Sequence, residues 1–433
     1  MNVHGGTRMR ELDKIIGYDS IKTELYRILD IINNLDKYKK LGVSTPKGIM
    51  LSGDPGIGKT LMAKCFIKES GRESFIIRKD RANGDFVNYI SEIFHKAVEN
   101  APSIILLDDM DKYANEDRYH RNAEEYVTVQ TCIDEIKEKN VFVLATCNDK
   151  NALPDSLIRS GRFDKVYEMR FPEGEDAKKI VAFYLKNKKV SCDVDPEEIA
   201  RFCQGRSCAE LETIVNEAGI YAGFENKDII CQEDLKRACL RKIYNMPESF
   251  NVVSDESIRY RAIHESGHAV MTEIFYKGMV NFASISAYDD GFCGGMVSRN
   301  RNTKGEDKLC DKEHEIMIAL AGKAATEILL NEVDMGSTSD MRKAFNNTRF
   351  LLDDYTAYDF HSWCHGEETS NRVYDHLDSV TGMEVSRYYL MTKKLLKMNM
   401  AFLEEMMDQL IKKKLLSYKD IAVIRAKHEI RTI

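Results

Sequence analysis

The chain has 433 residues, of which 43% are hydrophobic, enough to fill the cores of two or three domains. A formal net charge of −7 and a pI of about 5.9 argue against a general nucleic-acid binder, which normally carries a basic surface. With no signal-peptide core, no apolar run of roughly 18 residues and no C-x-x-C pair, the chain is expected to be soluble, cytoplasmic and reduced.

A phosphate-binding motif lies near the N-terminus. Apolar residues at helical spacing predict a helix over 21–41, and the apolar run 48–52 predicts the first core strand. The sequence after that strand fits G-x-x-x-x-G-K-[ST] and comprises Gly53, Asp54, Pro55, Gly56, Ile57, Gly58, Lys59 and Thr60. Because a helix pattern follows, the motif indicates a nucleotide site, in which Lys59 would reach the β- and γ-phosphates and Thr60 would bind Mg²⁺.

Strands and helices alternate after this loop. The predicted helices are 61–69, 86–99 and 124–138, and the strands that follow them are 74–77, 103–107 and 141–146. Helices of this length between strands imply right-handed crossovers, and therefore a parallel sheet covered on both faces.

Polar residues end two of the predicted strands. Asp108 and Asp109 follow strand 103–107, and Asn148 follows strand 141–146. A solvated acidic pair is the alternative interpretation, but the phosphate loop one crossover upstream favours Asp108 as a partner of Mg²⁺. Asn148 is suited to holding an attacking water beside the γ-phosphate.

Residues 174–246 are predicted to be helical, with no strands. The helices expected there are 177–186, 196–203, 208–223 and 232–244. Helical periodicity stops and polar residues gather at 247–254, which indicates a domain boundary.

The following domain contains a second motif. The segment 257–275 is predicted to be a helix, and its centre reads H-E-x-x-H, with His264, Glu265 and His268. Residues four apart share a helical face, so both imidazoles can bind one Zn²⁺ ion while Glu265 activates its water. A third protein ligand is required, and the residues alone leave four candidates open, namely His314, Glu327, Glu332 and Asp340.

Strands are expected at 282–286 and 291–298, around an Asp-Asp-Gly turn. The tail is expected to be helical over 383–414 and 418–426, and to serve packing.

These motifs together resemble the AAA+ ATPases and, within them, the FtsH family of zinc proteases. The segment 158–164 resembles that family's arginine-finger motif, which implies that Arg159 and Arg162 act in trans within a ring, most simply a homohexamer. The resemblance also makes ATP the nucleotide, places the turn 205–211 near the adenosine, and assigns Ile16 and Gly17 to adenine contact.

The resemblance also selects a third zinc ligand. The segments 321–327 and 336–341 are similar to two family motifs, the second of which ends on the ligand, and this implies Asp340. An edge strand near this site pairs with substrate in the family, and 294–297 is the candidate here.

The implied architecture has three parts. An α/β AAA+ ATPase core with a parallel sheet is expected over 1–171, a helical lid over 172–247, and a mostly α-helical zinc metalloprotease domain with a small β element over 251–433. The implied function is an ATP-dependent zinc endopeptidase that threads polypeptides. The alternative is a nucleotide-gated peptidase or chaperone-like assembly factor with weak unfolding power.

Three features depart from the family pattern. This chain shows no N-terminal membrane helices, and Asp109 replaces the glutamate normally found there. Residues 82–84 stand where an aromatic pore loop is expected, and Phe86 is the nearby aromatic that could substitute for it.

Overall fold

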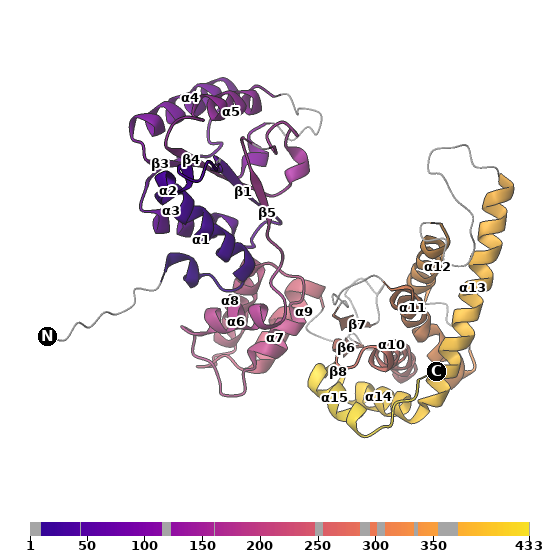
Figure 1. Cartoon of the computed structure of the whole chain (residues 1–433). Coiled ribbons are helices and arrows are strands. Elements are labelled where there is room, and N and C mark those ends of the chain that lie inside the picture. The colour runs from indigo at the N-terminus through magenta and orange to yellow at the C-terminus, as the bar shows by residue number, and fades with distance from the viewer. Residues whose placement is uncertain are drawn as a thin grey trace. The chain divides into compact units, whose positions relative to one another are not determined.

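The computed structural model describes residues 10–43, 45–114, 123–159, 161–246, 254–285, 295–300, 308–332, 337–353 and 371–432. The chain forms two compact units (Figure 1), the first comprising 1–191 with 205–230 and the second 192–204 with 231–433. We describe each unit by itself. None of the helices in the described ranges has the length and apolarity needed to cross a membrane.

The first unit is built on a five-stranded sheet in the order β2-β3-β4-β1-β5, and all of its pairs are parallel. The strands are β1 (Gly48–Ser52), β2 (Glu73–Ile77), β3 (Ser103–Leu107), β4 (Val141–Cys147) and β5 (Lys165–Glu168). The parallel α/β core predicted from the alternating pattern is thus confirmed. Strand β5 was not expected, because it is a short edge strand with no run of buried residues.

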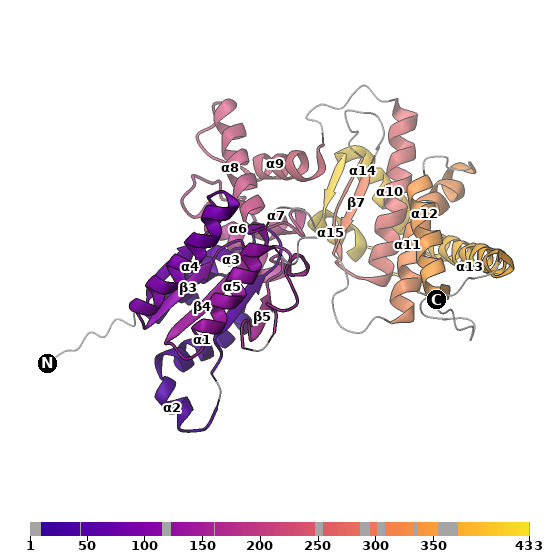
Figure 2. The same cartoon turned by 90° about the horizontal axis from the view of Figure 1, so that it is seen from above.

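Helices cover both faces of this sheet. They are α1 (Asp19–Asn33), α2 (Leu35–Lys39), α3 (Lys59–Ser70), α4 (Asn83–Glu99) and α5 (Glu124–Glu135), with short 3₁₀ helices at Glu11–Lys14, Met110–Lys112 and Lys150–Ala152. Alternate residues of β3 separate the two cores, since Ile104 packs with α1 and α3 whereas Ile105 packs with α4 and α5. Figure 2 shows α4 and α5 beside β3 and β4.

The single helix expected over 21–41 is interrupted in the structure. Asn34 leaves helical geometry, with φ −127° and ψ 41°, and separates α1 from α2. Its side-chain amide donates to Asp30 Oδ1 at 2.8 Å, a local hydrogen bond of the kind that competes with helix continuation.

Four helices follow the sheet. Helices α6 (Gly174–Leu185) and α8 (Cys208–Phe224) belong to the first unit, and α7 (Pro196–Phe202) and α9 (Gln232–Tyr244) belong to the second. Ser207 begins α8 with a capping box that it forms with Glu210, which explains why the turn before this helix is fixed.

The second unit is mainly helical. Its further helices are α10 (Asp255–Phe275), α11 (Leu309–Leu330), α12 (Thr338–Asp353), α13 (Asn371–Met398), α14 (Met400–Lys413) and α15 (Tyr418–Ala426). An antiparallel sheet has the order β7-β6-β8, with β6 (Val280–Ser284), β7 (Met296–Arg299) and β8 (Leu415–Ser417). The short strand β8 was not expected, and the expected Asp-Asp-Gly turn lies outside the described residues.

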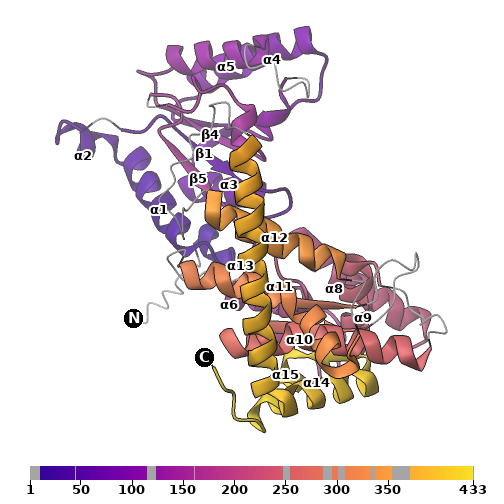
Figure 3. The same cartoon turned by 90° about the vertical axis from the view of Figure 1, so that its right-hand side faces the viewer.

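Small residues let α10 and α11 approach closely. A Cβ atom added to Gly267 would lie 2.4 Å from the Ala321 carbonyl oxygen and 2.8 Å from the Ala325 Cβ. Helices α12 and α13 pack against α11 in turn, and Figure 3 shows α13 as the longest of this group. The resulting core brings the middle of α10, the middle of α11 and the start of α12 together.

Candidate active sites

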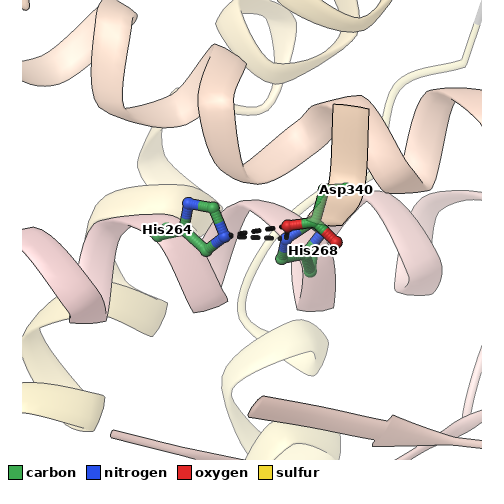
Figure 4. A group of neighbouring side chains, drawn as sticks. All are labelled: His264, His268 and Asp340. Carbon is green, nitrogen blue, oxygen red and sulfur yellow. Dashed lines mark hydrogen bonds and ion pairs between the residues drawn. The ribbon is translucent and has the colours of Figure 1, made fainter. Parts of the chain in front are cut away.

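The two histidines of H-E-x-x-H meet an aspartate from a different helix. His264 and His268 lie one turn apart on α10, and Asp340 lies in the first turn of α12 (Figure 4). Asp340 Oδ2 is 3.2 Å from Nε2 of His264 and 3.2 Å from Nε2 of His268, and the two Nε2 atoms are 3.1 Å apart. Three ligand atoms of the types that zinc prefers therefore point at one small volume.

These separations fit a bound metal ion. Tetrahedral coordination with zinc–nitrogen distances of roughly 2.0–2.1 Å places neighbouring ligand atoms about 3.3 Å apart. Gly322 faces this site from α11, and a Cβ atom there would lie 2.6 Å from Nε2 of each histidine. The absence of a side chain at Gly322 therefore leaves room beside the ligand atoms.

Hydrogen bonds orient the ligands. His268 Nδ1 lies 2.7 Å from the Ile318 carbonyl oxygen, so Nδ1–H donates to it and the Nε2 lone pair stays available for a metal. Burial would raise the pKa of Asp340, but its hydrogen bonds with His264 and His268 outweigh burial and hold that pKa well below the ordinary value. The aspartate is therefore anionic at neutral pH, as a metal ligand must be.

Glu265 lies beside this cluster and is only 7% exposed. Its Cγ and Oε1 face Gly295, where an added Cβ atom would come within 2.7 and 2.8 Å of them. Gly295 immediately precedes β7, which pairs with β6 and stands at one end of the described sheet. Glu265 is thus close to the strand segment predicted to bind substrate, whose first residue, Gly294, lies outside the described residues.

The three other ligand candidates have different surroundings. His314 stacks on Phe275 with ring centroids 3.8 Å apart. Glu327 accepts a hydrogen bond from Lys393 Nζ at 2.7 Å, on α13, and Glu332 is exposed just after α11. Among the described residues, only His264, His268 and Asp340 form a cluster of metal-ligating type.

The phosphate loop forms the turn from β1 into α3. Gly56 and Gly58 have φ angles of +78° and +99°, which residues with a Cβ rarely adopt. A Cβ atom at Gly56 would also lie 2.9 Å from Ser207 Oγ, so the turn before α8 packs directly on the loop. The Ala209 N–H donates to the Gly56 carbonyl oxygen at 3.1 Å, which fixes this approach.

Lys59 points back into its own loop. Its Nζ donates to the carbonyl oxygens of Gly53 and Asp54 at 2.7 and 2.8 Å, and to Asn148 Oδ1 at 2.9 Å. Burial lowers the pKa of this ammonium. Lys59 and Asn148 are therefore brought together from the two neighbouring strands β1 and β4.

Asp108 is almost fully buried at the end of β3. Its Oδ1 accepts hydrogen bonds from Thr60 Oγ1 at 2.9 Å and from Thr146 Oγ1 at 2.8 Å, and its Oδ2 pairs with Arg78. Burial would raise the pKa of Asp108, but hydrogen bonds from Arg78, Thr146 and Thr60 keep it below the ordinary value. The two residues predicted to serve Mg²⁺, Thr60 and Asp108, are thus in direct contact.

Asp109 has an unusual backbone. Its φ of 53° lies in the left-handed region, which short polar residues tolerate better than most. Its carboxylate pairs with Lys112 Nζ at 2.9 Å. Asp111, two residues further on, accepts from the backbone N–H of Asn148 at 2.9 Å and from its side-chain amide at 3.1 Å, and so orients Asn148.

A cavity of about 470 Å³ adjoins these residues. Its walls include the phosphate loop, Asp109 and Asn148, with Ile16 and Tyr18 before α1. Gly17 lies between those two residues in the sequence. It is close to Asp176, since a Cβ atom added to Gly17 would lie only 2.7 Å from Asp176 Oδ2. Aromatic and apolar residues of α6 and α8 complete the wall, namely Ile180, Phe183, Tyr184, Cys208 and Ala209.

The two predicted arginine fingers differ in environment. Arg159 is exposed, whereas Arg162 is 7% exposed and bound within its own chain. Arg162 donates to Asp134 Oδ2 at 2.7 Å, to Gln130 Oε1 at 3.0 Å and to a backbone carbonyl at 2.6 Å. The arrangement leaves Arg159 as the arginine of this segment that presents its side chain to solvent.

The segment expected at the pore belongs to a helix. Residue 82 is the N-cap of α4, and residues 83–84 form its first turn. Phe86 is fully buried and meets Tyr113 edge-on, with centroids 5.0 Å apart. Phe86 is a core residue, so the idea that it replaces an exposed pore aromatic is wrong.

Several site residues escaped the sequence prediction. Thr146, Asp111 and Arg78 act through contacts between strands that are distant in sequence, and Asp134 and Gln130 hold Arg162 from α5. The spacing D-D-x-D was an available signal for Asp111. The others carry no local pattern that distinguishes them from surface polar residues.

The fold and sites define the class as a P-loop ATPase module joined to a metallopeptidase module. A family model for the ATPase family associated with various cellular activities (AAA) matches 49–171, one for the AAA+ lid domain matches 193–237, and one for peptidase family M41 matches 251–424.

Curated relatives agree with this class. Proteins named "ATP-dependent zinc metalloprotease FtsH" are 31% identical in Leptotrichia buccalis, 28% in Helicobacter felis and 29% in Ruminiclostridium cellulolyticum. The alignments cover 81%, 96% and 79% of this chain, and 48%, 69% and 57% of those proteins, so the chain spans about half to two thirds of their length. The chain is therefore similar to the FtsH proteins over both its ATPase region and its peptidase region.

Proposed function

We propose that the protein is an ATP-dependent zinc endopeptidase, with Zn²⁺, ATP and Mg²⁺ as cofactors. The observation that carries the proposal is the cluster of His264, His268 and Asp340, which meets at metal-binding distances beside Glu265. The names of the curated relatives support zinc and ATP dependence. The family matches support the three-part division at 1–171, 172–247 and 251–433.

Peptide hydrolysis would use residues from three elements. His264, His268 and Asp340 would hold Zn²⁺, which when bound would supply Lewis-acid activation of a peptide carbonyl and of water. Glu265 takes the proton of the attacking water and later delivers it to the leaving amine. The β7 edge beside Glu265 holds the substrate backbone as an added strand, which suits substrates of many sequences.

At the nucleotide site, ATP binding would change the hydrogen-bond partners of Lys59. Lys59 now bonds to carbonyls of its own loop, and phosphate oxygens would replace those acceptors when ATP binds. Thr60 and Asp108 would hold Mg²⁺, and Asn148, oriented by Asp111, would hold the attacking water with Asp109. The cavity beside Ile16 and Gly17 would take the adenine.

We further propose self-association into a ring, most simply a homohexamer, that acts on polypeptides. Arg159 would reach the nucleotide of the neighbouring subunit, because its side chain is exposed. Arg162 would instead fix the segment that carries Arg159, since its donors are already used within its own chain.

Two observations favour a second candidate, a nucleotide-gated peptidase or assembly factor with weak unfolding power. Phe86 is buried, and the segment 82–84 forms the start of α4. Asp109 is one methylene shorter than glutamate and is already paired with Lys112. Both features weaken the link between ATP hydrolysis and the pulling of a chain.

Cleavage of a fluorogenic peptide by zinc-loaded protein tests the peptidase proposal. We expect cleavage that stops on treatment with a zinc chelator and returns with added Zn²⁺. A protein that binds Zn²⁺ stoichiometrically and cleaves neither peptides nor unfolded proteins would contradict it. Degradation of a stably folded substrate then separates the two candidates, because only the stronger motor supports it.

A further inference from the structure

Arg78 is the residue that follows β2, and it forms an ion pair with Asp108. The side chain of Asp108 is 1% exposed, whereas that of Arg78 is 59% exposed. A guanidinium on a largely solvated stem therefore neutralises a carboxylate that is itself removed from water. Because Asp108 is buried, loss of its contact with Arg78 would leave a carboxylate away from water without this partner. The pair therefore differs from an ion pair between two exposed side chains.

The two oxygens of Asp108 face different parts of the site. Oδ1 accepts from Thr60 of the phosphate-loop helix and from Thr146 of β4, and Oδ2 accepts from Arg78. In the sheet, β3 has β4 on one side and β2 on the other. Arg78 therefore contacts Asp108 from the β2 side of β3, whereas the phosphate loop, which follows β1, lies beyond β4 on the other side of β3.

This placement allows Arg78 to stay in contact while a cation binds at Thr60. The two hydroxyl groups already fix the orientation of Oδ1, so the main effect of Arg78 is on charge. A positive charge next to the only carboxylate that touches Thr60 in the described residues weakens the attraction of that carboxylate for a second cation.

We propose that Arg78 acts on the nucleotide site through its charge: it pairs with Asp108 from the β2 side and thereby lowers the affinity of the site for Mg²⁺. The inference rests on the proposed function, because it assumes that Mg²⁺ binds with nucleotide at Thr60 and Asp108. Arg78 thereby sets the Mg²⁺ concentration at which the site is filled.

The chain offers a matched control in the same segment. Arg81 is 47% exposed, pairs with Asp80 and lies over the Tyr89 ring at 3.9 Å, so it is an exposed arginine without contact to the acids of the site. Arg78→Gln and Arg81→Gln remove the same charge at nearly the same place in the sequence. Arg78→Lys keeps the charge and shortens the reach.

The test measures the affinity of a fluorescent ADP analogue for the full chain as free Mg²⁺ is varied from an EDTA-buffered baseline. For Arg78→Gln we expect the Mg²⁺ concentration at half-maximal effect to fall about tenfold, by removal of one nearby positive charge. Arg81→Gln should match the wild type, and Arg78→Lys should lie within about twofold of it.

Each outcome has a definite meaning. Equal Mg²⁺ midpoints for Arg78→Gln and wild type, or equal shifts in Arg78→Gln and Arg81→Gln, would overturn the inference. A rise of the midpoint in Arg78→Gln would also overturn it, because alignment of Asp108 would then outweigh charge. Failure of the wild type to bind the analogue at any Mg²⁺ concentration would instead overturn the proposed nucleotide site.

Discussion

The two candidate sites differ in the partners that their key side chains contact. At the metal site, the Nε2 atoms of His264 and His268 and a carboxylate oxygen of Asp340 already converge. At the nucleotide site, by contrast, Lys59 donates to carbonyl oxygens of its own loop, and Asp109 pairs with Lys112. The comparison teaches that a metal can enter the first site with little rearrangement, whereas a nucleotide must replace internal partners in the second.

Loss of the general base should have the largest effect. We expect Glu265→Gln to reduce peptide cleavage by about 10²–10⁴-fold, because the water would lose its proton acceptor while the ligands remain. Peptide turnover and zinc content would be measured on the same samples. Glu256→Gln is the matched control, since Glu256 is exposed in the first turn of the same helix. Full cleavage by Glu265→Gln would show that another residue activates the water.

Replacing the third ligand tests whether the metal site is assembled as described. Asp340→Asn should lower zinc affinity by roughly 100-fold or more, because a neutral amide replaces the anionic member of the ligand set. Competition with a chromophoric chelator would measure the change. Glu327→Gln should retain zinc, because Glu327 pairs with Lys393 on α13. Zinc loss in Glu327→Gln but not in Asp340→Asn would assign the third ligand to Glu327.

Substitutions of the two arginines in 158–164 should affect different properties, namely stability for Arg162 and ATPase activity for Arg159. Arg162→Ala should destabilise the first unit by about 2–4 kcal/mol, because a buried guanidinium and its hydrogen bonds are lost. Arg159→Ala should melt like the wild type but hydrolyse ATP more slowly at saturating ATP. Thermal melts and ATPase rates would be compared. Equal melting of all three proteins would contradict the role given to Arg162.

The ion pair between Arg162 and Asp134 predicts that the stability of the fold decreases at acidic pH. Hydrogen bonds from Arg162 and Lys137 lower the pKa of Asp134 to about 2. Because the folded pKa lies below the unfolded value of roughly 4, this contribution is complete above about pH 4 and is lost as the pH falls toward 2. Melting temperature measured across this range should fall less steeply in Arg162→Ala than in wild type. Parallel curves would exclude the linkage.

The smallest expected effect is an increase in the rate of ATP hydrolysis. Asp109→Glu should raise the ATPase rate severalfold, because the longer carboxylate reaches the water position more readily. The gain is limited by the left-handed backbone at this residue, which favours aspartate over glutamate. Asp80→Glu, at an exposed position after β2, is the control. An unchanged or lower rate in Asp109→Glu would indicate that aspartate is already the better residue here.

The sequence predicted what depends on local spacing. The phosphate loop, the histidines four residues apart and the strands 103–107 and 141–146 follow from short-range patterns, and the parallel core was confirmed. Residues joined only by the tertiary fold were not found in this way. Arg78 and Asp108 are 30 positions apart, and His264 and Asp340 are 76 apart, so only the family resemblance selected Asp340.

Strands β5 and β8 escaped prediction for a related reason. Each is short, and each becomes a strand only because a partner strand supplies its hydrogen bonds. The break at Asn34 likewise depends on one side-chain hydrogen bond, which periodicity does not reveal.

The central claim is that peptide cleavage needs only the assembled metal site, whereas unfolding needs the nucleotide site. Lys59→Ala tests it most directly, with a fluorogenic peptide and a stably folded protein as parallel substrates. We predict that zinc-loaded Lys59→Ala cleaves the peptide within about twofold of wild type and fails to degrade the folded protein. Loss of peptide cleavage with zinc retained, or degradation of the folded protein at the wild-type rate, would contradict the account.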